Sequence, residues 1–169
     1  MLGKRAEINS GAGLDQLDLA LKGWNALSGV MDIPRFHLAF PVRDLAEARA
    51  FYGALLECPE GRSSPEWVDF DFHGHQIVAH LAPAEPGRGA TSPVDGHDVP
   101  VRHFGVILTL VQWDALAARL KAAGTSFVIA PQVRFKGEPG EQATMFFLDP
   151  SGNALEFKAF ADDAQVFAT

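Results

Sequence analysis

Two apolar segments of this sequence begin with histidine, and each is followed by a helical pattern that ends at the same separation from that histidine. The first segment is "HLAFPV", from His37, and the second is "HFGVILTLV", from His103. The separation from His37 to Cys58 equals that from His103 to Gly124, at 21 residues, and both endpoints fall just after a helical pattern. Such self-similarity indicates an internal repeat, which constrains the chain to fold as two related units.

Each unit is predicted to run strand, helix and then three strands. In the first, "DLAEARAFYGALLE" has helical spacing with Asp44 as its cap, "WVDFDF" alternates, and "QIVAHL" is a further strand. In the second, "WDALAARLKAAG" is a helix, "FVIAP" and "VRFKG" are short extended segments, and "QATMFFLDPSGNALEFKAF" is two strands joined by a turn. One βαβββ unit cannot bury its sheet face alone. We therefore predict an α+β fold in which two βαβββ modules form a curved mixed sheet around a metal-binding cleft.

The domain boundaries follow from shifts in composition. Residues 1–31 begin Gly-rich and then carry leucines and a tryptophan at helical spacing, so they are predicted to be an N-terminal extension with a helix that the chemistry does not need. Residues 32–165 are predicted to form the domain. Module one spans about 34–82, a Pro/Gly-rich linker 83–100, and module two about 101–160.

Charge and composition exclude several classes of partner. The formal net charge of the 169 residues is -7 and the basic residues are scattered, which argues against nucleic-acid binding. No apolar run approaches the roughly 20 residues of a membrane-spanning helix, and no secretory signal is present. The single cysteine, Cys58, excludes an internal disulfide framework and favours a cytoplasmic protein, with Cys58 as a half-buried structural thiol.

The residues that most strongly indicate chemistry are His37, His103 and Glu156. Each histidine alone is typical of a polar strand end, but their joint place in a repeat favours metal binding. Glu156 lies within an otherwise apolar strand, where an unpaired carboxylate costs several kcal/mol. If the two modules pair about a pseudo-twofold axis, all three face one point. Two imidazoles and one carboxylate suit Fe(II), and also Mn(II), Ni(II), Co(II) or Zn(II).

His80 is the fourth candidate in this region. Aligning Gly74 with Gly152 puts Val78 opposite Glu156, and His80 lies two residues further on, so its side chain is predicted on the same face. His80 is either a fourth ligand or a general acid/base beside the metal. A satisfied polar group near the sheet edge is the structural alternative.

The loop "VRFKGEPGEQ" and the strand that contains Phe147 supply the candidate substrate contacts. Arg134 could hold an anionic substrate, although solvated cations are common on an acidic protein. Phe135 and Phe147 are candidate walls of the substrate cavity, although core packing is the usual fate of such residues. No GxGxxG, no GxxxxGK[ST] and no serine nucleophile elbow occurs, so nucleotide binding and serine-hydrolase chemistry lack support.

Three stretches together resemble the vicinal oxygen chelate superfamily. They are "FHLAFPVRDLAEARAFYGALLE", "RHFGVIL" and "FFLDPSGNALEFKAF", and the resemblance covers about 34–160. The superfamily includes glyoxalase I, extradiol ring-cleaving dioxygenases, fosfomycin resistance proteins, methylmalonyl-CoA epimerase and bleomycin resistance proteins. The resemblance implies paired βαβββ modules, one divalent metal between them, and His37, His103 and Glu156 as its ligands.

The resemblance leaves three functions open. The spacing of the three ligands is similar to that of the extradiol dioxygenases, which implies Fe(II), a small aromatic substrate with vicinal hydroxyls, and His80 as the acid/base. Such dioxygenases usually carry a tyrosine near the site, whereas the only tyrosine of this chain, Tyr52, lies on the first predicted helix. A glyoxalase I-like isomerase or lyase acting on a thiol adduct, with His80 as ligand and Glu156 as base, is the alternative. A non-enzymatic drug-binding resistance protein is the second alternative. The resemblance also allows a homodimer.

Overall fold

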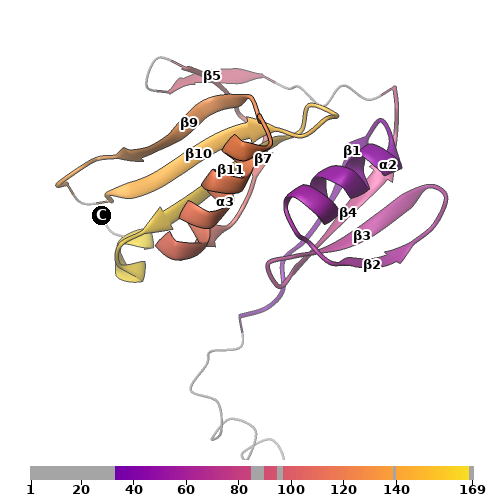
Figure 1. The fold of residues 1–169 in the computed structure, drawn as a ribbon, viewed down its shortest axis with the longest axis horizontal. Coiled ribbons are helices and arrows are strands. Elements are labelled where there is room, and N and C mark those ends of the chain that lie inside the picture. Colours follow the sequence, from indigo (N-terminus) through magenta and orange to yellow (C-terminus); the bar gives the residue numbers. More distant parts are fainter. Residues whose placement is uncertain (1–32, 85–89, 95–96, 139, 168–169) are drawn as a thin grey trace, which may run out of the picture. The chain divides into compact units, whose positions relative to one another are not determined.

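The computed structural model describes residues 33–84, 90–94, 97–138 and 140–167. The chain divides into two units, 1–34 and 35–169, and the elements below all belong to the second unit. The helix expected within residues 1–31 lies outside the described residues. Two modules follow one another along the second unit, and Figure 1 shows each as a sheet with its own helix.

The first module forms a four-stranded sheet in the order β1-β4-β3-β2. β1 and β4 are parallel, whereas the other neighbours are antiparallel. β2 is a strand of the predicted βαβββ order to which the sequence pattern assigns no residues. The elements are β1 (His37–Val42), α2 (Leu45–Ala48), the π-helix η1 (Arg49–Leu55), β2 (Glu60–Ser63), β3 (Trp67–Phe72) and β4 (His75–Leu81).

The second module repeats this plan in the order β7-β11-β10-β9, with β8 also paired to β11. The elements are β7 (His103–Phe104), β8 (Ile107–Leu108), α3 (Leu110–Ala122), β9 (Phe127–Arg134), β10 (Gln142–Leu148) and β11 (Ala154–Phe160). A hairpin of β5 (Thr91–Val94) and β6 (His97–Pro100) occupies part of the predicted linker, and a 3-10 helix, η2 (Asp163–Phe167), follows β11. The predicted α+β fold of two βαβββ modules with curved mixed sheets is confirmed.

The helices differ in detail from the predicted ones. The first begins as an α-helix capped by Asp44, whose side chain accepts from the Glu47 amide as predicted, and it continues as a π-helix. The second begins at Leu110, before the predicted "WDALAARLKAAG", because Thr109 and Gln112 form a capping box there. The apolar segment after His103 is therefore two short strands and the first turn of a helix, not one long strand.

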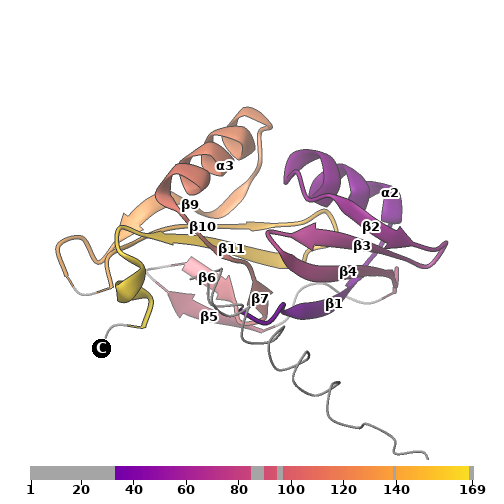
Figure 2. The ribbon, with the colours of Figure 1, turned by 90° about the horizontal axis from the view of Figure 1, so that it is seen from below.

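Aromatic side chains from both modules form one core. The ring centroids of Phe40 and Phe104 lie 5.2 Å apart and those of Phe72 and Phe157 lie 5.6 Å apart. Each of these pairs joins module one to module two, and all four side chains belong to or pack against a single buried cluster. Figure 2 shows α2 and α3 on the same side of the strands, over this core.

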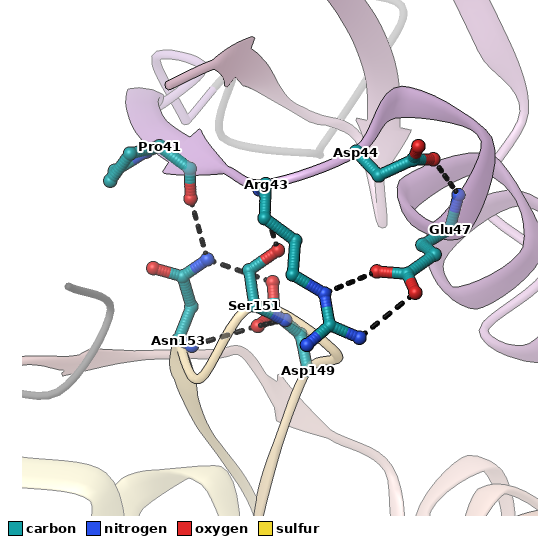
Figure 3. Close-up of polar contacts among 7 residues, drawn as sticks. All are labelled: Pro41, Arg43, Asp44, Glu47, Asp149, Ser151 and Asn153. Atoms are coloured by element: carbon teal, nitrogen blue, oxygen red, sulfur yellow. Dashed lines mark hydrogen bonds and ion pairs between the residues drawn. The ribbon is translucent and has the colours of Figure 1, made fainter. Parts of the chain in front are cut away.

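A turn of module two anchors the modules to each other (Figure 3). Asp149, at the end of β10, accepts hydrogen bonds from the Tyr52 hydroxyl at 2.9 Å and from the Asn153 side chain at 2.8 Å. The same Asn153 amide donates to the Pro41 carbonyl at 2.8 Å, and Ser151 accepts from the Arg43 amide at 3.0 Å. Buried polar groups are tolerated when they are paired in this way. Burial also raises the pKa of Tyr52 well above its ordinary value, so Tyr52 acts as a neutral donor in this link.

Candidate metal centre

Module two brings His103 and Glu156 together. Nε2 of His103 lies 3.3 Å from Oε2 of Glu156, and its Nδ1 lies 2.9 Å from the Pro100 carbonyl oxygen. Because a carbonyl can only accept, Nδ1 carries the proton, and a neutral His103 then directs its Nε2 lone pair at the carboxylate. Two facing lone pairs repel each other, so the geometry calls for a cation between them, either a proton or a metal ion.

Two further side chains hold the Glu156 carboxylate. The Thr144 hydroxyl, which is fully buried, donates to Oε1 at 2.9 Å, and the Lys158 ammonium lies 3.4 Å from Oε2. Burial raises the pKa of Glu156, but His103, Lys158 and Thr144 outweigh it and hold this pKa below its usual value. The hydrogen bond to Glu156 in turn raises the pKa of His103. Without a metal ion, this half of the site is an ion pair.

Gly105 permits the approach of the His103 segment to the Glu156 backbone. A Cβ atom at Gly105 would collide with the Glu156 carbonyl oxygen, so no larger residue fits at this position. The residue separates β7 from β8, both of which run parallel to β11. Glycine at this position therefore fixes how closely the histidine and the carboxylate can lie.

Module one presents His37 in a different polar setting. Nδ1 of His37 lies 2.8 Å from Oε1 of Gln76, and Nε2 of Gln76 donates to Oδ2 of the buried Asp69 at 3.0 Å. Arg62 reaches the same Asp69 oxygen at 3.4 Å. These side chains line a pocket of about 390 Å³ together with Arg35, Phe36, Gly61, Phe70, Asp71, Gly74 and His75.

The strand registers show which positions of the two modules correspond. His37 lies opposite Gln76 on β4, and His103 lies opposite Ala154 on β11, in both cases between parallel strands. Two residues further along, Val78 therefore corresponds to Glu156, as the glycine alignment predicts. A valine cannot bind a metal ion, so module one has no second carboxylate at this position.

His80 lies on the same face of β4 as Gln76 and Val78, but beyond them. It pairs with Pro41 of β1 and Trp67 of β3, four residues along the strand from Gln76. At the rise of a β-strand this separation is about 13 Å. His80 is exposed, and the structure does not place it beside His37.

A single chain does not bring His37 to the pair of His103 and Glu156. In the part of the chain that the structure describes, no three His, Cys, Asp or Glu side chains are grouped as metal ligands. Phe40 and Phe104 face the shared core. Because successive strand residues point to opposite faces, His37 and His103 lie on the faces turned away from that core.

The predicted substrate contacts have different surroundings. Phe147 is fully buried and its ring stacks on Phe157 in the core, so the aromatic residue beside His103 is Phe146, with ring centroids 5.0 Å apart. Phe135 is 46% exposed, and the Arg134 guanidinium lies 4.8 Å from its ring centroid. Arg134 pairs with Gln142 at the end of β9.

Sequence reasoning missed the residues that hold the candidate ligands. Lys158 could have been found by strand alternation, because it is two positions from Glu156 and so shares its face. The contacts of Asp69, Gln76 and Thr144 depend on which strands pair and in which register. The sequence carries no local signal for these contacts.

The sequence model of the glyoxalase/bleomycin resistance protein/dioxygenase superfamily matches residues 36–157. The chain belongs to this superfamily. A solved glyoxalase/bleomycin resistance protein/dioxygenase from Alicyclobacillus acidocaldarius is 36% identical, with a TM-score of 0.68, over 81% of this chain and 100% of that one. The predicted resemblance is thereby confirmed, and the superfamily includes metal-dependent enzymes.

Two more distant members share the fold. The fosfomycin resistance protein FosX from Listeria monocytogenes is 17% identical, with a TM-score of 0.59, over 80% of this chain and 100% of that one. A lactoylglutathione lyase from Agrobacterium tumefaciens is 17% identical, with a TM-score of 0.52, over 76% of this chain and 94% of that one. No curated protein matches the sequence significantly. Among the described helices of this superfamily member, none is long and apolar enough to cross a membrane.

Proposed function

We propose that this superfamily member is a divalent-metal-dependent enzyme whose metal is held by His103 and Glu156 of one copy and His37 of a second copy. The observation that carries the proposal is the set of hydrogen-bond partners of the His37 and His103 ring nitrogens. Each has its Nδ1 engaged by an oxygen, from Pro100 or from Gln76, which directs Nε2 away from that partner, and Nε2 of His103 faces the Glu156 carboxylate. Metal-binding histidines commonly have this arrangement.

The donor set fits a divalent transition metal. Two imidazole nitrogens and one carboxylate suit Fe(II), Mn(II), Ni(II), Co(II) or Zn(II), and they leave coordination positions open for a substrate. When bound, such an ion supplies a Lewis acid for two neighbouring oxygens of the substrate. The protein's own contribution is to orient the ligands. Thr144 and Lys158 hold the Glu156 carboxylate, and Phe146 packs against the His103 ring.

A second copy is proposed because the two half-sites are on outward faces of the chain. Both βαβββ modules use their helix-covered faces for the shared aromatic core, and on the opposite face of module two Phe146 and Ala154 pack against Val99 of β6. His37 and His103 are nevertheless exposed, so a second copy can reach them. A twofold dimer would place module one of each copy against module two of the other, which creates two equivalent sites. The homodimer expected from the resemblance is therefore part of the proposed site.

The three-ligand set favours a dioxygenase-type reaction on a small aromatic substrate with vicinal hydroxyls. Fe(II) is the metal proposed for it, because a set of two histidines and one carboxylate is typical of non-haem Fe(II) oxygenases. The position of His80, about 13 Å along β4 from Gln76, weighs against a glyoxalase I-like site in which His80 is a further ligand. His80 is not included in the proposed site, since it lies four residues beyond Gln76 on β4.

Lys158 supports a second candidate function. Lys158 lies 3.4 Å from Glu156, and if Glu156 held a metal ion, the Lys158 ammonium would be available to an anionic group of the substrate. This would suit a non-oxidative, metal-dependent reaction on an anionic small molecule. The two functions differ in their need for oxygen. Oxygen uptake with catechols in the presence of Fe(II) would support the dioxygenase. Metal-dependent turnover of anionic substrates or hemithioacetals under nitrogen would support the non-oxidative reaction.

Mixing two variant chains tests the shared site. His37→Ala and Glu156→Ala should each bind metal poorly, but a dimer of one chain of each kind retains one complete site. After denaturation and refolding of an equal mixture, about half of the dimers are mixed, so about a quarter of the sites should bind metal again. Metal content by mass spectrometry measures this. No recovery in a dimeric mixture would exclude a site shared between copies, and stoichiometric metal in His103→Ala would exclude the site altogether.

A further inference from the structure

We propose that Asp69 acts through Gln76 to determine which ring nitrogen of His37 carries the proton. The inference rests on the proposed function in taking His37 as a metal ligand. Asp69 and Gln76 are positioning residues in this proposal, since neither needs to touch the metal or the substrate. Their effect would be to keep Nε2 of His37 free of a proton before any metal arrives.

The first step is the orientation of the Gln76 side chain. An amide can present either its oxygen or its nitrogen to a neighbour, and turning it over exchanges the two. Asp69 is only 6% exposed, and its Oδ2 lies 3.0 Å from Nε2 of Gln76. An ionised carboxylate can only accept hydrogen bonds, so the NH₂ group of Gln76 must face it. The Arg62 guanidinium lies 3.4 Å from the same oxygen.

The second step transfers this orientation to His37. With its NH₂ group directed at Asp69, Gln76 must direct Oε1 at Nδ1 of His37, 2.8 Å away. That oxygen accepts and cannot donate, so Nδ1 must carry the proton. In a neutral ring Nε2 is then the unprotonated nitrogen, and it is available as a ligand.

A comparison with His103 indicates why the side-chain pair is needed. In module two, Nδ1 faces the backbone carbonyl of Pro100, which is always an acceptor, and Nε2 faces the Glu156 carboxylate. In module one the acceptor is an amide side chain, which has no fixed orientation of its own. A carboxylate at position 69 removes that ambiguity, whereas an asparagine of the same size would not, because it can also present either end.

Nitrogen NMR of the imidazole rings in the metal-free protein tests the proposal. At alkaline pH, where both rings are neutral, wild-type His37 should show protonated Nδ1 and free Nε2. Gln76→Leu and Asp69→Asn should each give a mixture of the two tautomers. His103 serves as the control within each sample, and its ring nitrogen signals should be the same in every variant as in the wild-type protein. Circular dichroism and thermal unfolding verify that the variants are folded.

The double variant Asp69→Asn, Gln76→Glu provides a rescue. It exchanges the carboxylate and the amide but preserves the pattern, because the new asparagine can donate to the new glutamate, which then accepts from Nδ1 of His37. The double variant should restore the single His37 tautomer that Asp69→Asn loses. A purely structural role of these residues would not be rescued in this way.

Metal affinity gives the second measurement. Loss of a group that orients a metal-binding histidine typically lowers affinity 10–100-fold, so we expect such a loss in Gln76→Leu and Asp69→Asn. His80→Ala, on the same face of β4, should leave affinity unchanged. A single Nδ1-protonated tautomer of His37 in Gln76→Leu would overturn the inference. If the wild-type protein bound no metal, the proposed function would fail, while the NMR comparison would still decide the role of Asp69.

Discussion

The two modules share one plan, but they support their histidines by different means. Gln76 and Ala154 occupy corresponding positions opposite His37 and His103. In module one the side chain of Gln76 engages Nδ1 of the histidine, whereas in module two Ala154 cannot, and the Pro100 carbonyl does so instead. The same property, an oxygen acceptor at Nδ1, is thus obtained from a side-chain pair in one module and from the backbone in the other.

The modules also differ two residues further along the same strands. Module two carries Glu156, which is held by Thr144, whereas module one carries Val78. Ala39 of β1 corresponds to Gly105, so β1 continues where the equivalent segment of module two is divided into β7 and β8. The repeat has therefore kept the histidine position in both modules and assigned the carboxylate to one.

The largest difference between the modules should appear in metal binding. Glu156→Gln removes the negative charge of the proposed carboxylate ligand, so metal affinity should fall by more than the 10–100-fold typical of a supporting residue. Val78→Ala, at the corresponding position, should leave it unchanged. Titration with Co(II) or Zn(II), followed by calorimetry, measures both. Equal losses in the two variants would contradict the division of roles between the modules.

A backbone comparison should give the next largest effect. Gly105→Ala forces a methyl group against the Glu156 carbonyl, and overpacking of this kind costs about 1–3 kcal/mol or more in the free energy of unfolding. Ala39→Gly adds only backbone freedom in β1, at a cost of about 0.5–1 kcal/mol. Urea unfolding followed by tryptophan fluorescence compares them. A neutral Gly105→Ala would mean that the segment after His103 does not need to approach β11 closely.

The turns that end β10 and β3 are expected to differ by a smaller amount. Asn153→Ala removes hydrogen bonds to Asp149 and Pro41 within a buried link between modules, so unfolding should become easier by about 2–3 kcal/mol. Asp71→Ala removes an exposed bond to the Gly74 amide, worth about 0.5–1.5 kcal/mol. Thermal unfolding of both variants tests the comparison. Similar losses would show that the Asp149 turn has no special role in joining the modules.

The smallest effect concerns Cys58, which occurs in module one alone. Burial raises the pKa of its thiol to about 12, with Asp71 adding to the rise. The folded state therefore favours the protonated thiol. This contribution to stability is complete below the ordinary thiol pKa of about 8.5 and is lost as the pH rises toward the folded value.

Unfolding experiments between neutral and alkaline pH measure the Cys58 contribution. Cys58→Ala should lose less stability on going to alkaline pH than the wild-type protein does, whatever its stability at neutral pH. The native thiol should also resist iodoacetamide until the protein unfolds, because alkylation needs an accessible thiolate. Rapid alkylation of the folded protein at neutral pH would contradict its burial.

Much of the fold could be predicted because it depends on local patterns. Helical spacing after His37 and His103, the Asp44 cap and the alternation of "WVDFDF" each follow from residues near one another in the chain. The second helix began early because the capping box of Thr109 and Gln112 is a stronger start signal than the apolar residues before it. The hairpin of β5 and β6 was missed because prolines and glycines there indicate a linker equally well.

The site could be predicted in part. His103 and Glu156 lie together because parallel strands of one module bring them to the same face, which the sequence pattern can indicate. His37 belongs to the other module, and its position relative to that pair depends on how two modules pack. No local pattern records that packing, and the inward aromatic faces of β1 and β7 decided it.

The sequence by itself determined the two βαβββ units, the histidine that begins each of them and the single carboxylate, since these are matters of residue type and spacing. Only the tertiary structure decided that Phe146, not Phe147, lies beside His103, that His80 is remote from His37, and that Asp69 reaches His37 through Gln76. The physical reason is that strand register and module packing are set by many weak contacts between distant residues. A side chain's neighbours across a sheet are therefore fixed only when the whole core has formed.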